Sequence, residues 1–260
     1  MEATTQFTAL ILILLVFILN ALVRRHDRAQ MRRIRAFAIV PQITGESIEA
    51  NRPLHVSLGG ATIGGDTTLL ALVGKEFIYY LTREVVIGDA SPIFTVSDTT
   101  ALPLTMDTLR RAYNAEGRSD AFLALSGRWY PSGNRLAFAA ALMTMQADDQ
   151  VSGNVLTGRY GAELALVLNA SNRHKKGSIA VSDRLDGQAV AYALATEALI
   201  GEEIFAAPGY LSDDVSLTNR NIVLDRVRWL LILVLIGIPI LRPLLPTILE
   251  TIGSIFGIGG

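Results

Sequence analysis

Four glycines and four charged residues are the strongest candidates for a ligand site, because they follow short apolar runs. The glycines lie in Gly59-Gly-Ala-Thr-Ile-Gly-Gly65, directly after the run Leu54–Leu58. A glycine turn before a helix can bind a phosphate through backbone N–H groups. This turn lacks the Gly-Lys-Ser/Thr end of a P-loop and does not match G-x-G-x-x-G, so a plain tight turn is the competing interpretation. The candidate ligand residues are Gly59, Gly60, Gly64, Gly65, Asp98, Arg128, Arg159 and Asp183.

The charged candidates also have two interpretations each. Asp98 and Asp183 follow a serine at the end of an apolar run, where they could bind a metal or act as acid and base. They could equally cap the helices that follow. Arg128 and Arg159 could hold an anion with two parallel hydrogen bonds, or simply be solvated. We assign no catalytic residue from these patterns.

Few other residues suggest chemistry. Glu202 and Glu203 are adjacent carboxylates in an apolar setting, suited to a metal or a proton but also to the first turn of a helix. His26, His55 and His174 have no serine, aspartate or second histidine at a diagnostic spacing. The sequence therefore predicts neither a metal site nor a cofactor.

Short apolar runs alternate with helical patterns over residues 36–222. The predicted strands are Leu54–Leu58, Ile93–Val96, Ala121–Leu125, Asn154–Thr157 and Ser178–Val181. The predicted helices start near Asp66 or Thr67, near Thr99 or Thr100, and at Asn134, Gly161 and Gly187. This alternation predicts an α/β fold, a Rossmann-like parallel sheet with helices on both faces. Since ligands of such sheets bind beyond the carboxyl ends of the strands, the candidate residues are expected at that edge.

Composition limits the functional classes. The chain has 260 residues and a net charge of −1, which offers no field for nucleic acid. It contains no cysteine, which excludes disulfides, thiolate catalysis and cysteine-ligated zinc. Half of the residues are hydrophobic, with the excess concentrated at the two ends.

The first apolar segment, Ala3–Val23, is long enough to cross a bilayer as a helix. Its positive charges follow it, whereas those of a signal peptide precede the apolar stretch, so we expect an uncleaved anchor. We expect anionic lipid headgroups to contact the arginines after it. These are Arg24, Arg25, Arg28, Arg32, Arg33 and Arg35.

The second apolar segment is Trp229–Leu241, preceded by Arg226 and Arg228. One interpretation is a kinked span that continues to about residue 250. The other, which we prefer, is a short span followed by an amphipathic helix after Pro243 on the outer surface. In either case we expect two transmembrane helices to flank the α/β domain.

Arginine-rich flanks remain in the cytoplasm, which predicts a two-pass protein with both termini outside and the central domain in the cytoplasm. The expected organisation is an anchor over residues 1–35, an α/β domain over 36–222 and a membrane segment with its tail over 223–260.

Several motifs carry a family resemblance. They are Leu54-His-Val-Ser-Leu-Gly59, Asn154-Val-Leu-Thr-Gly158 with Gly161-Ala-Glu163, Leu199-Ile-Gly-Glu-Glu-Ile-Phe-Ala-Ala207 with Gly209-Tyr-Leu211, and Leu224-Asp-Arg-Val-Arg-Trp-Leu230. They resemble an uncharacterised family of bacterial membrane proteins that carry a domain of unknown function. The resemblance covers about residues 36–241, and it implies the same fold and a placement in the bacterial inner membrane, but no activity or site.

Two functions are expected from these observations. The first is a membrane-anchored, non-enzymatic scaffold or assembly subunit that binds lipid and associates with itself or with a membrane partner. The alternative is a binding or enzymatic module that takes a nucleotide or another anion at the strand ends.

Overall fold

The computed structural model describes residues 18, 31–131, 133–212 and 214–241. Contacts divide the chain into two compact units. One comprises Arg32–Asp213 and is called the α/β unit below; the other combines Met1–Met31 with Asp214–Gly260. Each unit is described by itself.

A six-stranded, fully parallel sheet forms the centre of the α/β unit. Its strands are β1 (His55–Gly59), β2 (Ile93–Val96), β3 (Gly127–Trp129), β4 (Asn154–Arg159), β5 (Ser178–Ser182) and β6 (Glu197–Ala198). Their order is β3-β2-β1-β4-β5-β6, the order of doubly wound Rossmann sheets. The predicted Rossmann-like parallel sheet is therefore confirmed, and strand order reverses between β1 and β4.

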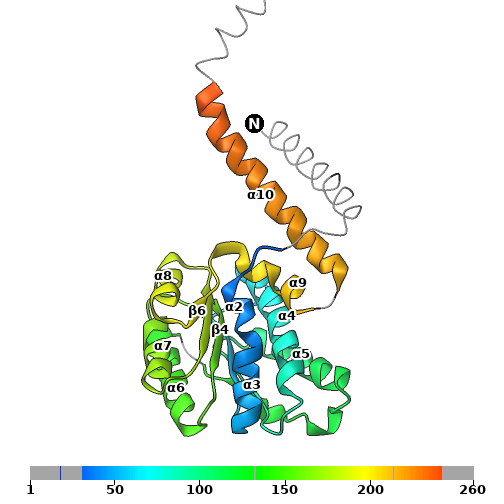
Figure 1. Cartoon of the computed structure of the whole chain (residues 1–260). Helices are drawn as coiled ribbons and strands as arrows, with labels where there is room; N and C mark the ends of the chain where they lie inside the picture. Colours follow the sequence, from blue (N-terminus) through cyan, green and yellow to red (C-terminus); the bar gives the residue numbers. More distant parts are fainter. Residues whose placement is uncertain (1–17, 19–30, 132, 213, 242–260) are drawn as a thin grey trace, which may run out of the picture. The chain divides into compact units, whose positions relative to one another are not determined.

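Helices cover both faces of the sheet (Figure 1). One face carries α2 (Arg35–Ala38), α3 (Val40–Ala50), α4 (Thr68–Val85), α5 (Ala101–Ala115) and α9 (Ala207–Leu211). The other carries α6 (Arg135–Asp148), α7 (Leu164–Arg173) and α8 (Leu185–Leu194). Three short 3-10 helices complete the unit, at Ser119–Ala121 (η1), Ala124–Ser126 (η2) and Gly201–Ala206 (η3).

Alternating side chains of the strands build one apolar core on each face. Val56 and Leu58 of β1 pack toward α4, whereas Leu156 of β4 packs toward α6 and α7. All strand residues of β1, β2 and β5 are buried, as expected for a sheet covered on both sides. Local signals set the helix starts. At α6, for example, the side chain of Asn134 accepts a hydrogen bond from the N–H of Leu136 at 2.9 Å.

The predicted strand Ala121–Leu125 is wrong. That segment forms η1 and η2, and the third strand is Gly127–Trp129. Leu125 is 85 % exposed, so its apolar character does not mark a buried strand. Gly127 begins this strand, and a Cβ there would lie 2.2 Å from the sulfur of Met106 in α5. The sixth strand, β6, and the helices α2 and α3 were not predicted.

The described part of the second unit is dominated by α10 (Val215–Leu241). It begins ahead of the expected boundary at residue 223 and continues through the apolar run from Trp229. Met31 packs against Ile222, Val223 and Val227. Within the ranges that the structure describes, no helix combines the length and the apolar character needed to cross a membrane. The expected anchor at 3–23 and the tail after Pro243 lie outside the described residues, apart from Ile18.

Candidate functional site

The carboxyl ends of the strands bring several candidates together, as expected. The N–H of Gly60 donates to the carbonyl of Arg159 at 3.1 Å, which joins the ends of β1 and β4. Ser97, after β2, donates from its N–H (3.1 Å) and its hydroxyl (3.0 Å) to the carbonyl of Gly59. Hydrogen bonds thus join the carboxyl ends of β2, β1 and β4, next to the point where strand order reverses.

Beneath this point lies a buried tyrosine that the sequence analysis missed. The hydroxyl of Tyr160 donates to Ser57 Oγ at 2.6 Å, and burial raises the pKa of Tyr160. A Cβ on Gly59, whose φ is 55°, would lie 2.7 Å from the tyrosine ring. The absence of a side chain at Gly59 therefore leaves room for the ring of Tyr160, so this glycine serves packing.

Arg159 makes ion pairs that span three strand ends. Its Nη1 lies 2.8 Å from Asp66 Oδ2, while Nε and Nη2 lie 2.8 and 2.5 Å from Asp183 Oδ2. These carboxylates raise the pKa of Arg159, and the Arg159 guanidinium lowers that of Asp66. One cation is thus surrounded by two carboxylates, so a bound anion would enter a site that is already net negative.

The backbone donors of residues 59–64 in the glycine turn are also occupied. Gly59 donates to Ser57 Oγ, Thr62 to Thr67 Oγ1 and Ile63 to Thr100 Oγ1, at 3.1, 2.9 and 2.9 Å. Gly60, Ala61 and Gly64 donate to Arg159 O, Leu58 O and Thr68 Oγ1. A phosphate cradle presents free N–H groups. Here the N–H groups of residues 59–64 all donate within the protein, and an anion would have to displace these bonds.

The two aspartates have different surroundings. Asp98 Oδ1 accepts the N–H of Thr100 at 2.8 Å and its hydroxyl at 2.5 Å, directly before α5. This geometry matches the capping interpretation. Asp183 instead faces Arg159, as described above, and does not lie in a group of carboxylates and histidines. Among the described residues, no cluster of three or more histidines, aspartates or glutamates could hold a metal ion.

Arg128 lies apart from the other candidates. It belongs to β3 itself and forms a bidentate pair with Asp149, at 2.5 and 2.8 Å. This carboxylate raises the pKa of Arg128. Asp149 follows α6 and precedes β4, so the guanidinium is held toward the amino ends of the strands. Arg128 was expected after a third strand at Ala121–Leu125. Because the third strand is instead Gly127–Trp129, Arg128 lies within it.

A second charged cluster surrounds Gly161, and the sequence analysis did not single it out as a site. Glu163 is buried and its Oε1 accepts the N–H of Gly161 at 2.7 Å. A Cβ on Gly161 would lie 2.7 Å from Glu163 Oε2 and 2.9 Å from both Arg135 Nη1 and Asp186 Oδ2. Asp186 also pairs with Arg184 at 3.0 Å. The charged side chains at the starts of α6, α7 and α8 therefore meet around Gly161.

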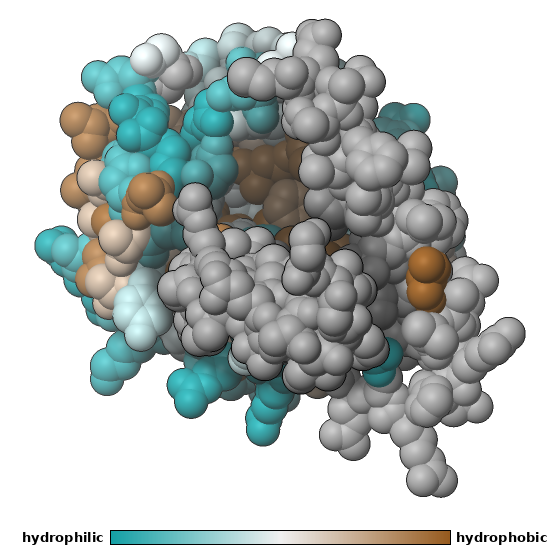
Figure 2. Space-filling model, turned by 90° about the horizontal axis from the view of Figure 1, so that it is seen from above, coloured by the Kyte–Doolittle hydropathy of each residue, from teal (hydrophilic) through white to brown (hydrophobic). Residues whose placement is uncertain are grey.

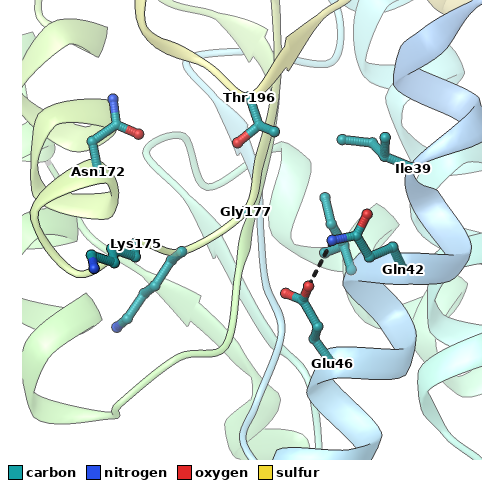
Figure 3. A pocket seen from close by; sticks show the side chains of 9 residues that line it. Ile39, Gln42, Glu46, Asn172, Lys175, Gly177 and Thr196 are labelled. Atoms are coloured by element: carbon teal, nitrogen blue, oxygen red, sulfur yellow. Dashed lines mark hydrogen bonds between the residues drawn. The ribbon is translucent and has the colours of Figure 1, made fainter.

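A separate cavity of about 320 Å³ opens at the amino ends of β5 and β6 (Figure 3). Ile39, directly before α3, and Ile43 within it line one side, with Glu46 accepting from Gln42 Nε2 at 2.9 Å. The turn after α7 lines the other side through Asn172, Lys175, Lys176 and Gly177, together with Thr196. Lys176 Nζ donates to Gln146 O at 3.0 Å, so its charge is partly engaged within the protein.

The lipid candidates are only partly described. Arg32 Nη2 lies 2.7 Å from Glu203 Oε1, and Glu203 Oε2 also accepts the N–H of Ile200 at 2.9 Å. Glu202 and Glu203 therefore occupy the first turn of a helix, η3, as one interpretation expected. Arg33 and Arg35 line a recess beside β6 with Glu197. Arg24, Arg25 and Arg28 lie outside the described residues.

The hydroxyl groups of Ser57 in β1 and Ser182 in β5 form hydrogen bonds within the core. Ser57 is fully buried and donates to Thr95 O at 3.2 Å, while Ser182 donates to Tyr160 O at 2.6 Å. A nucleophilic serine needs a neighbouring base and access to substrate. Neither Ser57 nor Ser182 has both.

Comparison with known proteins gives a family and no activity. The chain matches no curated protein and no solved structure. A family model described as a domain of unknown function, DUF6754, matches residues 1–248, nearly the whole chain. The sheet, its two helical layers and the closed strand ends described above are thus features of a member of this family: the chain belongs to the DUF6754 family.

Proposed function

We propose that this protein is a membrane-anchored, non-enzymatic scaffold or assembly subunit that associates with itself or with a membrane partner. The observation that carries the proposal is a contact between the two ends of the α/β unit. The hydroxyl of Tyr210 donates to the carbonyl of Arg32, and the guanidinium of Arg32 pairs with Glu203. The chain therefore enters and leaves the folded unit at one place.

This arrangement suits a domain held by two flanking apolar segments. The run Ala3–Val23 ends shortly before Arg32, and the run from Trp229 begins shortly after Asp213. If both runs cross the bilayer, the contact between Tyr210 and Arg32 fixes where the unit is tethered. The arginines on the inner flank of each run support a location of the unit in the cytoplasm of a bacterial cell, with both termini outside.

The non-enzymatic part of the proposal is supported by the strand ends. The N–H donors of residues 59–64 are used internally, and Arg159 is matched by Asp66 and Asp183. Enzyme sites instead keep donors, acids or nucleophiles directed at the substrate. The carboxyl edge of this sheet therefore supports a non-enzymatic role, in which the rigid α/β unit binds partners through its surface.

The absence of native cysteine makes a topology test direct. We would introduce single cysteines as Asn169→Cys, at an exposed position of α7, and Glu2→Cys, directly before the apolar run Ala3–Val23, and label spheroplasts with a membrane-impermeant maleimide. Glu2→Cys should react in intact spheroplasts, and Asn169→Cys only after lysis. Labelling of Asn169→Cys before lysis, or release of the protein from membranes by carbonate, would overturn the proposed placement.

A further inference from the structure

Two arginines and a glutamate line one recess of the α/β unit without pairing. The recess has a volume of about 560 Å³, and its lining consists of Arg33, Arg35, Ala38, Ile39 and Glu197. Within the part of the chain that the structure describes, Arg33, Arg35 and Glu197 make no hydrogen bond and no ion pair, either with each other or with another residue. Two guanidinium groups and one carboxylate thus share a hollow but remain apart.

The backbone directs both arginines to the same side of the chain. Ile34 between them is extended, with φ −103° and ψ 119°, and its side chain is buried. Because side chains alternate along an extended chain, Arg33 and Arg35 point away from the core, and both are exposed. Ala38 and Ile39 follow one helical turn after Arg35 and form the apolar wall of the recess.

The neighbouring Arg32 has a different role. Its guanidinium lies 2.7 Å from the carboxylate of Glu203, and its carbonyl accepts from the hydroxyl of Tyr210. Arg32 therefore holds the two ends of the α/β unit together. Arg33 and Arg35 make no comparable contact with the described residues, so their charges are free to bind a ligand.

Apolar exposure alone would not mark this recess as a site. Figure 2 shows that hydrophobic residues interrupt the hydrophilic ones on the described surface, and single exposed apolar residues are common on proteins. The distinguishing feature is the set of opposite charges, since a carboxylate beside two arginines ordinarily pairs with one of them. A ligand that carries both a negative and a positive group satisfies all three side chains at once.

We propose that this recess binds a phospholipid headgroup that has both a phosphate and a primary ammonium group. Arg33 and Arg35 hold the phosphate oxygens through charge-assisted hydrogen bonds, for which guanidinium groups are well suited. The ammonium group donates to the carboxylate of Glu197, while Ala38 and Ile39 contact the carbon atoms of the lipid. The inference rests on the proposed function, because membrane anchoring is what brings the unit to such headgroups.

The test uses the full-length chain in lipid-free detergent, with short-chain lipids as probes. Calorimetric titration would measure the affinity for the dihexanoyl forms of phosphatidylethanolamine, phosphatidylglycerol and phosphatidylcholine. Phosphatidylethanolamine should bind roughly tenfold more tightly than the other two, because neither a glycerol hydroxyl nor a quaternary ammonium donates a charge-assisted hydrogen bond to Glu197. Equal affinities for the three lipids would overturn the proposal.

Substitutions separate the roles of the charges. The double variant Arg33→Gln, Arg35→Gln should weaken the binding of all three lipids roughly tenfold, since the phosphate is common to them. Glu197→Gln should weaken phosphatidylethanolamine alone and so remove the preference. The matched control is Arg173→Gln, because Arg173 at the end of α7 is also exposed and makes no hydrogen bond or ion pair with the described residues.

The affinities of these variants decide whether the recess is the site. A double variant that binds lipid as tightly as Arg173→Gln would overturn it, with circular dichroism during heating to show that both variants are folded. Free phosphoethanolamine should bind more weakly than the short-chain lipid, because it lacks the carbon atoms that contact Ala38 and Ile39. Equal affinity of the two would overturn the lipid assignment in favour of a soluble ligand.

Failure of this site and failure of the proposed placement have different signatures. Loss of the lipid preference, with cysteine labelling as expected, would overturn the headgroup site alone. Labelling of Asn169→Cys before lysis would overturn the cytoplasmic placement, whichever lipids bind in detergent.

Discussion

His55 Nδ1 lies 2.6 Å from Asn154 Oδ1, which joins β1 to β4 in the core of the α/β unit. The amide nitrogen of Asn154 donates to Ser171 Oγ at 2.8 Å and to Gln146 Oε1 at 3.1 Å, so its oxygen is left to accept from the imidazole. The other ring nitrogen lies 2.9 Å from the hydroxyl of Thr95. This assigns a neutral histidine with its proton on Nδ1.

The first prediction concerns the pH dependence of stability. Burial lowers the pKa of His55 from 6.5 to about 4. Between these values the unfolded chain binds more protons than the folded chain, so stability must fall as pH is lowered from 6.5 toward 4. The expected loss from this group is about 2 kcal/mol between pH 7 and pH 5. Urea unfolding at the two pH values measures it, with His55→Gln as the comparison. An equal loss in both proteins would contradict the assignment.

The second prediction concerns Gly158, whose φ is 140°. A Cβ at this position would lie 1.9 Å from the carbonyl oxygen of Leu58 in the neighbouring strand. Gly158→Ala should therefore destabilise the protein by at least about 3 kcal/mol, or prevent folding. Gly133→Ala is the matched control because a Cβ there meets nothing within 4 Å. Similar melting temperatures for both variants would show that the backbone at Gly158 can relax.

The third prediction concerns anion binding at the strand ends. Since Arg159 is paired and the N–H donors of residues 59–64 are occupied, nucleotides and inorganic phosphate should leave the melting temperature unchanged. The Asp66 side chain is 75 % exposed, whereas Arg159 and Asp183 are 34 % and 25 % exposed, so Arg159→Gln should lower stability only modestly, by about 1 kcal/mol. A shift in the wild type that disappears in Arg159→Gln would instead support the alternative function, a small-anion site at this edge.

The fourth prediction concerns autonomy of the α/β unit. Both apolar cores of the sheet lie between Arg32 and Asp213. A fragment of residues 32–213 should therefore remain soluble and unfold in one cooperative transition, which circular dichroism during heating would monitor. Shortening the fragment to 36–209 removes Arg32 and Tyr210 and should lower the melting temperature. A broad, non-cooperative transition of the 32–213 fragment would contradict the assignment of Arg32–Asp213 as a unit that folds by itself.

Much of the fold could be predicted because the signals are local. β2 lies where the sequence placed it, and β1, β4 and β5 differ at their ends by only one or two residues. Short apolar runs followed by capping residues define such elements within a few positions of the chain. The prediction failed at residues 121–125, where an apolar run is exposed in 3-10 turns, and at β6, whose two residues are too few to form a pattern.

The candidate site could be predicted only in part. The sequence placed Gly59, Asp98, Arg159 and Asp183 at the carboxyl edge, since parallel strands all end there. It did not reveal that Asp66 neutralises Arg159 or that Asp149 holds Arg128 elsewhere. These pairs join residues 93 and 21 positions apart. Their formation depends on strand order and helix packing, which no local pattern records.

By itself, the sequence determined the α/β class, the positions of most strands and the two apolar segments bordered by arginine, because hydrophobic periodicity and charge are properties of neighbouring residues. Only the tertiary structure decided the order of the strands, the contact between Tyr210 and Arg32, and the pairing of Arg159 with Asp66 and Asp183. The physical reason is that these features arise when residues distant in the chain compete for the same buried surface and hydrogen bonds, and that competition is resolved only in the folded unit.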